Sequence, residues 1–250
     1  MSFSLSQLNS LSSLISTNPN EVKALIKLAS IDVLKSLGNG KFTVVMDGET
    51  LTVQSDRPLL EGEKYWTQLT HSKGSILLLS NLLKKPDILH NIHLKNIEYS
   101  IKDLQTILNS KNPLSTMKQS ILEQLSSAST KEEFTNLSNL LLSIHNQTLT
   151  IPISFNNYYS ILQFKKRYNK KNKKTHIDFY AVLEFLGPIS GLITLQGNDT
   201  IVKLNVAFET TKTFLENNMQ SFSHTIDISI AQNIEPLYNS NINSILDVSI

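Results

Sequence analysis

The stretch that decides the fold is HIDFYAVLEFLGPISGLITLQGNDTIVKLNVAF, residues His176–Phe208. It contains two apolar runs that alternate like strands and meet at Leu186-Gly187-Pro188. A third run follows the turn signal Gly197-Asn198-Asp199. We expect a mostly polar helix over Thr211–Phe222 and a last strand over Thr225–Ile230. This order predicts a mixed, mainly antiparallel sheet packed with one or two helices.

The sheet is expected to begin before this stretch. Ile151–Phe155 and Tyr158–Phe164 predict a strand pair, because both are short, apolar and rich in β-branched or aromatic residues. We therefore place a C-terminal domain at residues 148–235 and a tail at 236–250. At 250 residues, 40% of them hydrophobic, the chain is long enough for two small domains, and the predicted class is α+β.

This domain resembles the C-terminal domain of the bacterial flagellar hook-length control family. That family often carries Pro-Glu-x-Leu-Gly at the corner, and here Glu184, Leu186 and Gly187 match while Leu183 stands at the proline position. The other matching segments are Leu149–Ile153, Leu162–Lys166, Ile193–Leu195 and Ile201–Phe208.

The resemblance implies a function without enzymatic activity. Members of the family leave the cytoplasm through the flagellar type III apparatus while the hook grows. Their C-terminal domain contacts the cytoplasmic domain of the export gate and switches the exported class from hook to filament subunits. The implied partners are the export gate and hook or hook-cap proteins, and the implied location is the cytoplasm, with export as an alternative. The candidate partner-binding residues are Glu184, Leu186, Gly187 and Pro188.

The amino-terminal segment, residues 1–20, has no charged residue and is rich in serine. It lacks the basic start and continuous apolar core of a cleavable signal peptide. A loosely docked terminal helix and an uncleaved type III export signal are both compatible with it. The longest strongly apolar run is Ile76–Leu79, much shorter than the ~20 residues of a membrane span, so we expect no membrane insertion.

Residues 21–70 predict a small β-barrel of OB or SH3-like type. Short alternating runs are separated by Gly38-Asn39-Gly40 and by Asp47-Gly48, a dipeptide typical of two-residue hairpin turns. A barrel of this type can bind nucleic acid through exposed aromatic side chains. Phe42 lies in phase with the apolar alternation and is expected in the core, so only Tyr65 or Trp66 can face out. The mixed local charge disfavours nucleic acid.

Residues 71–147 predict a helical middle. Asn112-Pro113 can start one helix, and Thr130 with Glu133 fits a capping box for another. The expected apolar faces are Ile76, Leu79, Leu82 and Leu83; Ile97, Ile101, Leu104 and Leu108; Leu114, Met117, Ile121 and Leu125; and Phe134, Leu137, Leu141 and Ile144.

The sequence offers little to catalysis. It has no cysteine, which excludes disulfides, thiolate metal sites and cysteine nucleophiles. His90 and His93 are spaced like metal ligands but lack a further ligand nearby. No G-x-S-x-G, Walker or G-x-G-x-x-G motif is present. We predict no enzyme, no catalytic residue, no metal site and no cofactor.

The segment Lys165–Lys174 holds seven of the 23 basic residues and no acidic one, so it accounts for the net charge of +2. A solvated hairpin tip, an acidic protein partner and nucleic acid are the alternatives. Because arginine dominates base and phosphate recognition and the chain has only two arginines, we expect no specific nucleic acid binding. The basic positions are Lys165, Lys166, Arg167, Lys170, Lys171, Lys173 and Lys174.

Overall fold

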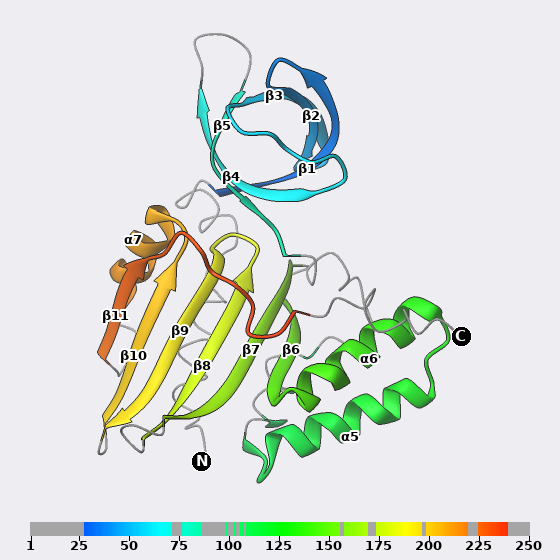
Figure 1. The fold of residues 1–250 in the computed structure, drawn as a ribbon, viewed down its shortest axis with the longest axis vertical. Coiled ribbons are helices and arrows are strands. Elements are labelled where there is room, and N and C mark those ends of the chain that lie inside the picture. Colours follow the sequence, from blue (N-terminus) through cyan, green and yellow to red (C-terminus); the bar gives the residue numbers. More distant parts are fainter. Residues whose placement is uncertain are drawn as a thin grey trace.

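A computed structural model describes residues 28–71, 77–86, 99, 103, 106–107, 109–155, 158–169, 174–196, 199–219 and 225–239. This part of the chain holds a closed five-stranded barrel, a six-stranded sheet and three long helices (Figure 1). The protein is therefore α+β, with a barrel toward its amino-terminal end. None of the helices in the described ranges is long and apolar enough to cross a membrane.

The barrel is closed by contacts between strands distant in sequence. Its strand order is β1-β2-β3-β5-β4, and β4 pairs antiparallel with β1 to complete the ring. One neighbouring pair, β3 with β5, is parallel. The strands are β1 (Leu28–Gly38), β2 (Lys41–Met46), β3 (Glu49–Ser55), β4 (Lys64–His71) and β5 (Leu77–Lys84).

The tight turns of the barrel follow the predicted turn chemistry. Met46 pairs with Glu49, so Asp47 and Gly48 form a two-residue turn with φ of 52° and 85°. Two successive residues with positive φ are the signature of a type I′ turn, which suits the twist of a hairpin. Phe42 is buried in the barrel core, which confirms the prediction from its phase.

The expected helix over Ile76, Leu79, Leu82 and Leu83 is wrong, because Leu77–Lys84 form β5. A short apolar run cannot be assigned to helix or strand by periodicity alone. Pairing with both β3 and β4 satisfies the main chain of this strand and buries Leu79 in the barrel core. The barrel thus continues past residue 70, and the helical middle begins later than predicted.

Two helices of the middle begin as predicted. In α5 (Pro113–Ser126) the side chain of Asn112 accepts from the Ser115 amide at 3.3 Å. In α6 (Lys131–His145) Thr130 accepts from the Glu133 amide at 3.1 Å. These bonds satisfy amides that have no partner within the helix.

The apolar faces of these helices are mostly as expected. Met117, Ile121 and Leu137 are fully buried. Phe134 is 53% exposed, because the buried face of α6 passes through Leu137 and Leu140 instead. The apolar positions of the expected helix between Ile97 and Leu108, and the pair His90 and His93, lie outside the described residues.

The large sheet has the order β11-β10-β9-β8-β7-β6. Its neighbours are antiparallel except β10 and β11, which are parallel and joined through α7 (Glu209–Asn217). The last strand covers the predicted Thr225–Ile230, while α7 ends earlier than the predicted Phe222. The strands are β6 (Thr148–Phe155), β7 (Tyr158–Asn169), β8 (Lys174–Leu183), β9 (Gly187–Gln196), β10 (Asp199–Val206) and β11 (Thr225–Ile230).

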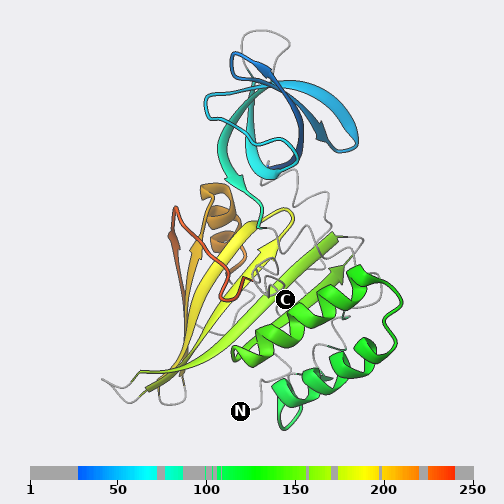
Figure 2. The ribbon, with the colours of Figure 1, turned by 45° about the vertical axis from the view of Figure 1, so that its right-hand side comes forward.

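Helices α5 and α6 pack against the β6 edge of the sheet, and a chain segment crosses the sheet (Figure 1). Leu149, Ile151 and Ile153 of β6 form one core cluster with residues of α5 and α6. After β11, residues 231–239 run across the strands toward β7 (Figure 2), and we call this segment the strap. The expected tail, residues 236–250, therefore begins within the strap.

The barrel packs against one end of the sheet. Leu28 and Trp66 of the barrel belong to the same core cluster as Val182, Phe208 and Phe214 of the sheet domain. Figure 1 shows the barrel beside the end of the sheet that carries the β8–β9 turn and α7. The corner singled out by the sequence therefore lies where the two parts of the protein meet.

Candidate functional site

The corner between β8 and β9 is a three-residue turn that depends on glycine. Leu183 pairs with Gly187, which leaves Glu184–Leu186 as the turn. Gly187 has a φ of +74°, and a Cβ atom there would lie 2.7 Å from Cε2 of Phe208. A side chain at this position would be strained by its backbone and would collide with a buried ring. The sharp corner predicted at Gly187 thus has two physical causes.

Glu184 connects this corner to the barrel. Its backbone oxygen accepts a hydrogen bond from Nε1 of Trp66 at 3.1 Å. Its Oε1 forms a salt bridge with Nζ of Lys85 at 2.7 Å, and the Lys85 side chain is only 6% exposed. Nζ of Lys85 also lies 5.2 Å from the centre of the Trp66 ring, within cation–π range. We call Trp66, Lys85 and Glu184 the corner lock.

The first turn of α7 adds two hydrogen bonds beside the corner lock. Oγ1 of Thr211 donates to the backbone oxygen of Leu186 at 2.8 Å. Nε2 of Gln68 on β4 donates to Oγ1 of Thr210 at 3.1 Å. The helix, the corner and the barrel strand are thus joined by polar contacts around the shared apolar cluster, which fixes their register.

The structure brings the four candidate partner-binding residues together but does not leave them on an open surface. Gly187 and Pro188 are buried, and Glu184 and Leu186 are half-buried. The corner contacts the barrel in this conformation. A partner that contacts Gly187 and Pro188 directly must therefore displace the parts of the protein that bury them.

Sequence reasoning missed the barrel side of this site. Either Tyr65 or Trp66 was expected to face out, but both are buried. Tyr65 belongs to the barrel core, whereas Trp66 packs into the cluster shared with the sheet domain. An outward-facing tryptophan on a strand of a small barrel was the available signal, because exposing so large an apolar surface favours docking against another domain.

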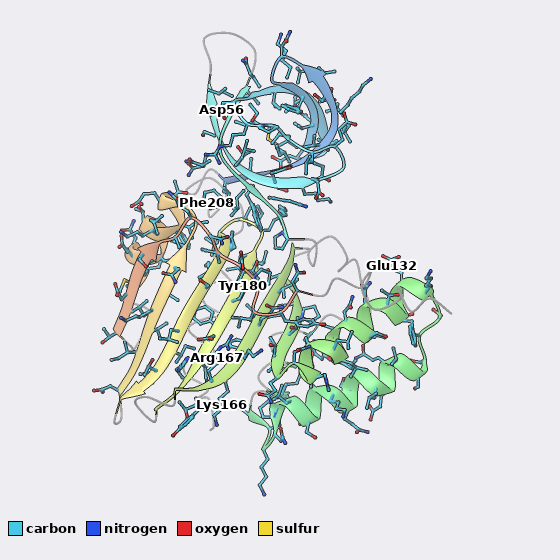
Figure 3. The ribbon with its side chains drawn as sticks, viewed as in Figure 1. Asp56, Glu132, Lys166, Arg167, Tyr180 and Phe208 are labelled. Atoms are coloured by element: carbon cyan, nitrogen blue, oxygen red, sulfur yellow. The ribbon has the colours of Figure 1, made fainter. Side chains whose placement is uncertain are left out.

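The basic segment is shorter as a loop than expected. Lys165, Lys166 and Arg167 belong to β7, which runs to Asn169 before β8 starts at Lys174. Figure 3 shows Lys166 and Arg167 toward the end of the sheet opposite the barrel. Lys170, Lys171 and Lys173 lie outside the described residues, as does the side chain of Lys174.

Asp178 neutralises part of this positive charge. Its Oδ2 forms a salt bridge with Nε of Arg167 at 2.5 Å, and its Oδ1 lies 3.5 Å from Nε2 of His176. Lys165 is its direct neighbour across the strands. Tyr168 is 58% exposed, but it follows Arg167 on the strand and therefore projects from the opposite face. The face that carries Arg167 and Asp178 is therefore a partly compensated basic surface, and the aromatic ring of Tyr168 lies on the other face.

The middle of β8 holds a buried phenol. Tyr180 is 1% exposed, and its hydroxyl has no hydrogen-bond partner among the residues that the structure describes. Burial raises the pKa of Tyr180 far above its ordinary value. The group therefore stays protonated at neutral pH and does not act as a base. Among the residues that the structure describes, no group of three or more histidine or acidic side chains could hold a metal ion.

No protein-family model and no curated protein matches this chain.

Proposed function

We propose that this chain is a non-enzymatic interaction protein of flagellar hook-length control. In this proposal its C-terminal domain contacts the cytoplasmic domain of the export gate and switches the class of exported subunits. The observation that carries the proposal is the arrangement β8, corner, β9, β10, α7 and β11, with a glycine at the corner that tolerates no side chain. This element order is the one that the resemblance implies.

The barrel supports a role in binding proteins. A five-stranded Greek-key ring with parallel β3 and β5 fits an OB-type barrel, a fold used for binding. Its surface carries mixed charge, as in the pairs Lys64–Asp32 at 3.0 Å and Lys84–Glu63 at 2.9 Å. Phe42, Tyr65 and Trp66 are buried and unavailable for stacking on bases. These features favour a protein partner over nucleic acid.

Contact through the corner requires the barrel to move. Glu184 is held by Trp66 and Lys85, and the backbone of Gly187 lies close to Leu28. A partner that binds the corner must therefore open the corner lock. Because Trp66 is the sole tryptophan and is fully buried, its fluorescence reports that opening directly.

The proposal is tested by hook length, measured by electron microscopy of flagella from a strain that lacks this protein. We expect overlong hooks without filaments. Complementation with the Gly187→Val chain should leave the hooks overlong, whereas the control Lys203→Gln, at an exposed position of β10, should restore them. Hooks of normal length that bear filaments in the deletion strain would overturn the proposed function.

A second candidate function is binding of an acidic protein by the basic end of β7. The exposed side chains of Lys166 and Arg167 at this end of the sheet favour it. We expect affinity for an acidic protein to fall with salt and to be lost when the lysines of Lys165–Lys174 are changed to glutamine. Tight binding of a DNA or RNA oligonucleotide at physiological salt would favour nucleic acid instead.

A further inference from the structure

A polar row crosses the large sheet beneath the strap. One residue from each strand takes part, and each is paired directly with the next across the strands. Directly paired residues project from the same face of a sheet. The row consists of Thr150, Gln163, Tyr180, Ser190, Asn205 and Ser229.

Gln163 forms hydrogen bonds with the main chain of the strap. Its Nε2 donates to the backbone oxygen of Tyr238 at 2.8 Å, and its Oε1 accepts from the Tyr238 amide at 3.2 Å. The same Nε2 lies 3.3 Å from Oγ1 of Thr150, and Gln163 is fully buried. The side-chain amide of Gln163 therefore pairs with both the N–H and the C=O of Tyr238, as the main chain of a neighbouring strand would. Such a contact recognises an extended backbone of any sequence.

The strap fills this site imperfectly. Its apolar side chains, Ile234 and Leu237, pack against the core but stay half-buried. Tyr180 lies directly opposite Gln163, and its buried hydroxyl has no hydrogen-bond acceptor in the described part of the chain. A buried donor without a partner is unfavourable. A ligand that offered an acceptor at that point would satisfy a group that the strap leaves unsatisfied.

We infer that the polar row at Thr150, Gln163 and Tyr180 is a binding site for an extended peptide of a partner protein, occupied here by the strap. The peptide carries two aliphatic side chains three residues apart, as Ile234 and Leu237 are. Gln163 pairs with its main chain one residue later. An amide or carboxylate on the peptide accepts from Tyr180. The inference is independent of the proposed flagellar function.

The test uses the full-length chain and a fluorescein-labelled synthetic peptide with the sequence of residues 231–239, followed by fluorescence anisotropy. Ile234→Asp with Leu237→Asp releases the strap and leaves Gln163 in place. We expect this chain to bind the peptide at least tenfold more tightly than the unaltered chain. Adding Gln163→Leu should abolish the binding. Equal affinity with and without Gln163→Leu would overturn the site.

A milder variant covers the case in which the released chain does not fold, as judged by Trp66 emission and circular dichroism. Tyr238→Pro removes the amide that Gln163 accepts from and keeps both aliphatic anchors. This chain should also gain affinity for the peptide, while a peptide with the same proline should not bind. The absence of binding to a folded Tyr238→Pro chain would contradict the inference.

The acceptor for Tyr180 is tested with a peptide series that places Asp in turn at each position except the two anchors and Tyr238. At least one member should bind several-fold more tightly than the parent peptide, and Tyr180→Phe should remove that gain. If none does so, the role of Tyr180 is wrong. Concentration-dependent dimers that exchange straps, seen by light scattering, would assign the site to a second copy instead.

Discussion

Two salt bridges along β8 lie in opposite surroundings. At its C-terminal end Lys85 and Glu184 form a salt bridge in which the lysine side chain is 6% exposed. About 20 Å from Glu184, for six residues at ~3.3 Å each, Asp178 in the middle of β8 pairs with Arg167, whose side chain is 51% exposed. Removing one partner of a buried pair costs about 3–5 kcal/mol, whereas exposed pairs contribute about 0–1 kcal/mol. Burial, rather than distance between charges, decides which pair holds the protein together.

The largest effect is expected at the corner itself. Gly187→Ala forces a side chain into a positive φ and against Phe208, whereas Gly38→Ala meets a φ of +81° with nothing within 4 Å. A side chain at positive φ costs about 1–2 kcal/mol, and overpacking adds about 1–3 kcal/mol. Urea unfolding followed by Trp66 fluorescence should show a clearly greater loss for Gly187→Ala. Equal losses would mean that Phe208 gives way freely.

Breaking the corner lock should come next. Glu184→Gln leaves the Lys85 charge buried without its counter-ion, and we expect the free energy of unfolding to fall by about 2–4 kcal/mol. Glu184→Leu combined with Lys85→Met replaces both charges by apolar groups and should recover most of that loss. A double-mutant cycle measured by urea unfolding gives the coupling energy. Strictly additive losses would show that the pair contributes nothing at the junction.

Tyr180, which lies between Asp178 and Glu184 in the chain, is expected to give a smaller and pH-dependent effect. Tyr180→Phe removes a hydroxyl without a partner and should stabilise the fold at pH 7 by up to about 1 kcal/mol. Because the pKa of Tyr180 is raised in the folded state, ionisation favours the unfolded chain, so the fold is unaffected below the ordinary tyrosine pKa and loses stability as the pH rises above it. The advantage of Tyr180→Phe should therefore grow above pH 10 in urea titrations. An advantage that is constant with pH would contradict this.

The smallest effect is expected at the basic end. Arg167→Gln removes an exposed salt bridge and should lower the free energy of unfolding by less than about 1 kcal/mol. Salt at 1 M should reduce even this difference, because it screens exposed charges. Thermal unfolding in low and high salt, with Glu184→Gln in parallel, compares the two salt bridges directly. A loss at Arg167 as large as that at Glu184 would remove the distinction between them.

Local chemistry made several elements predictable. The caps at Asn112 and Thr130 and the turn at Asp47-Gly48 each depend on residues within a few positions of one another. The last strand, Thr225–Ile230, follows from alternation bounded by polar residues. The spacing of Ile76, Leu79, Leu82 and Leu83 predicts a helix, whereas pairing with β3 and β4 makes Leu77–Lys84 a strand.

The candidate site was predictable on one side only. The need for Gly187 at a corner is visible in the chain, since glycine before proline marks a sharp turn. Its partners Trp66 and Lys85 lie 118 and 99 residues from Glu184 along the chain, and Gln163 lies 75 residues from Tyr238. Turns and caps form from neighbouring residues and can be inferred locally. The contacts between barrel, sheet and strap depend on how these parts bury their apolar groups together. They join residues far apart in the chain, so only the tertiary structure reveals them.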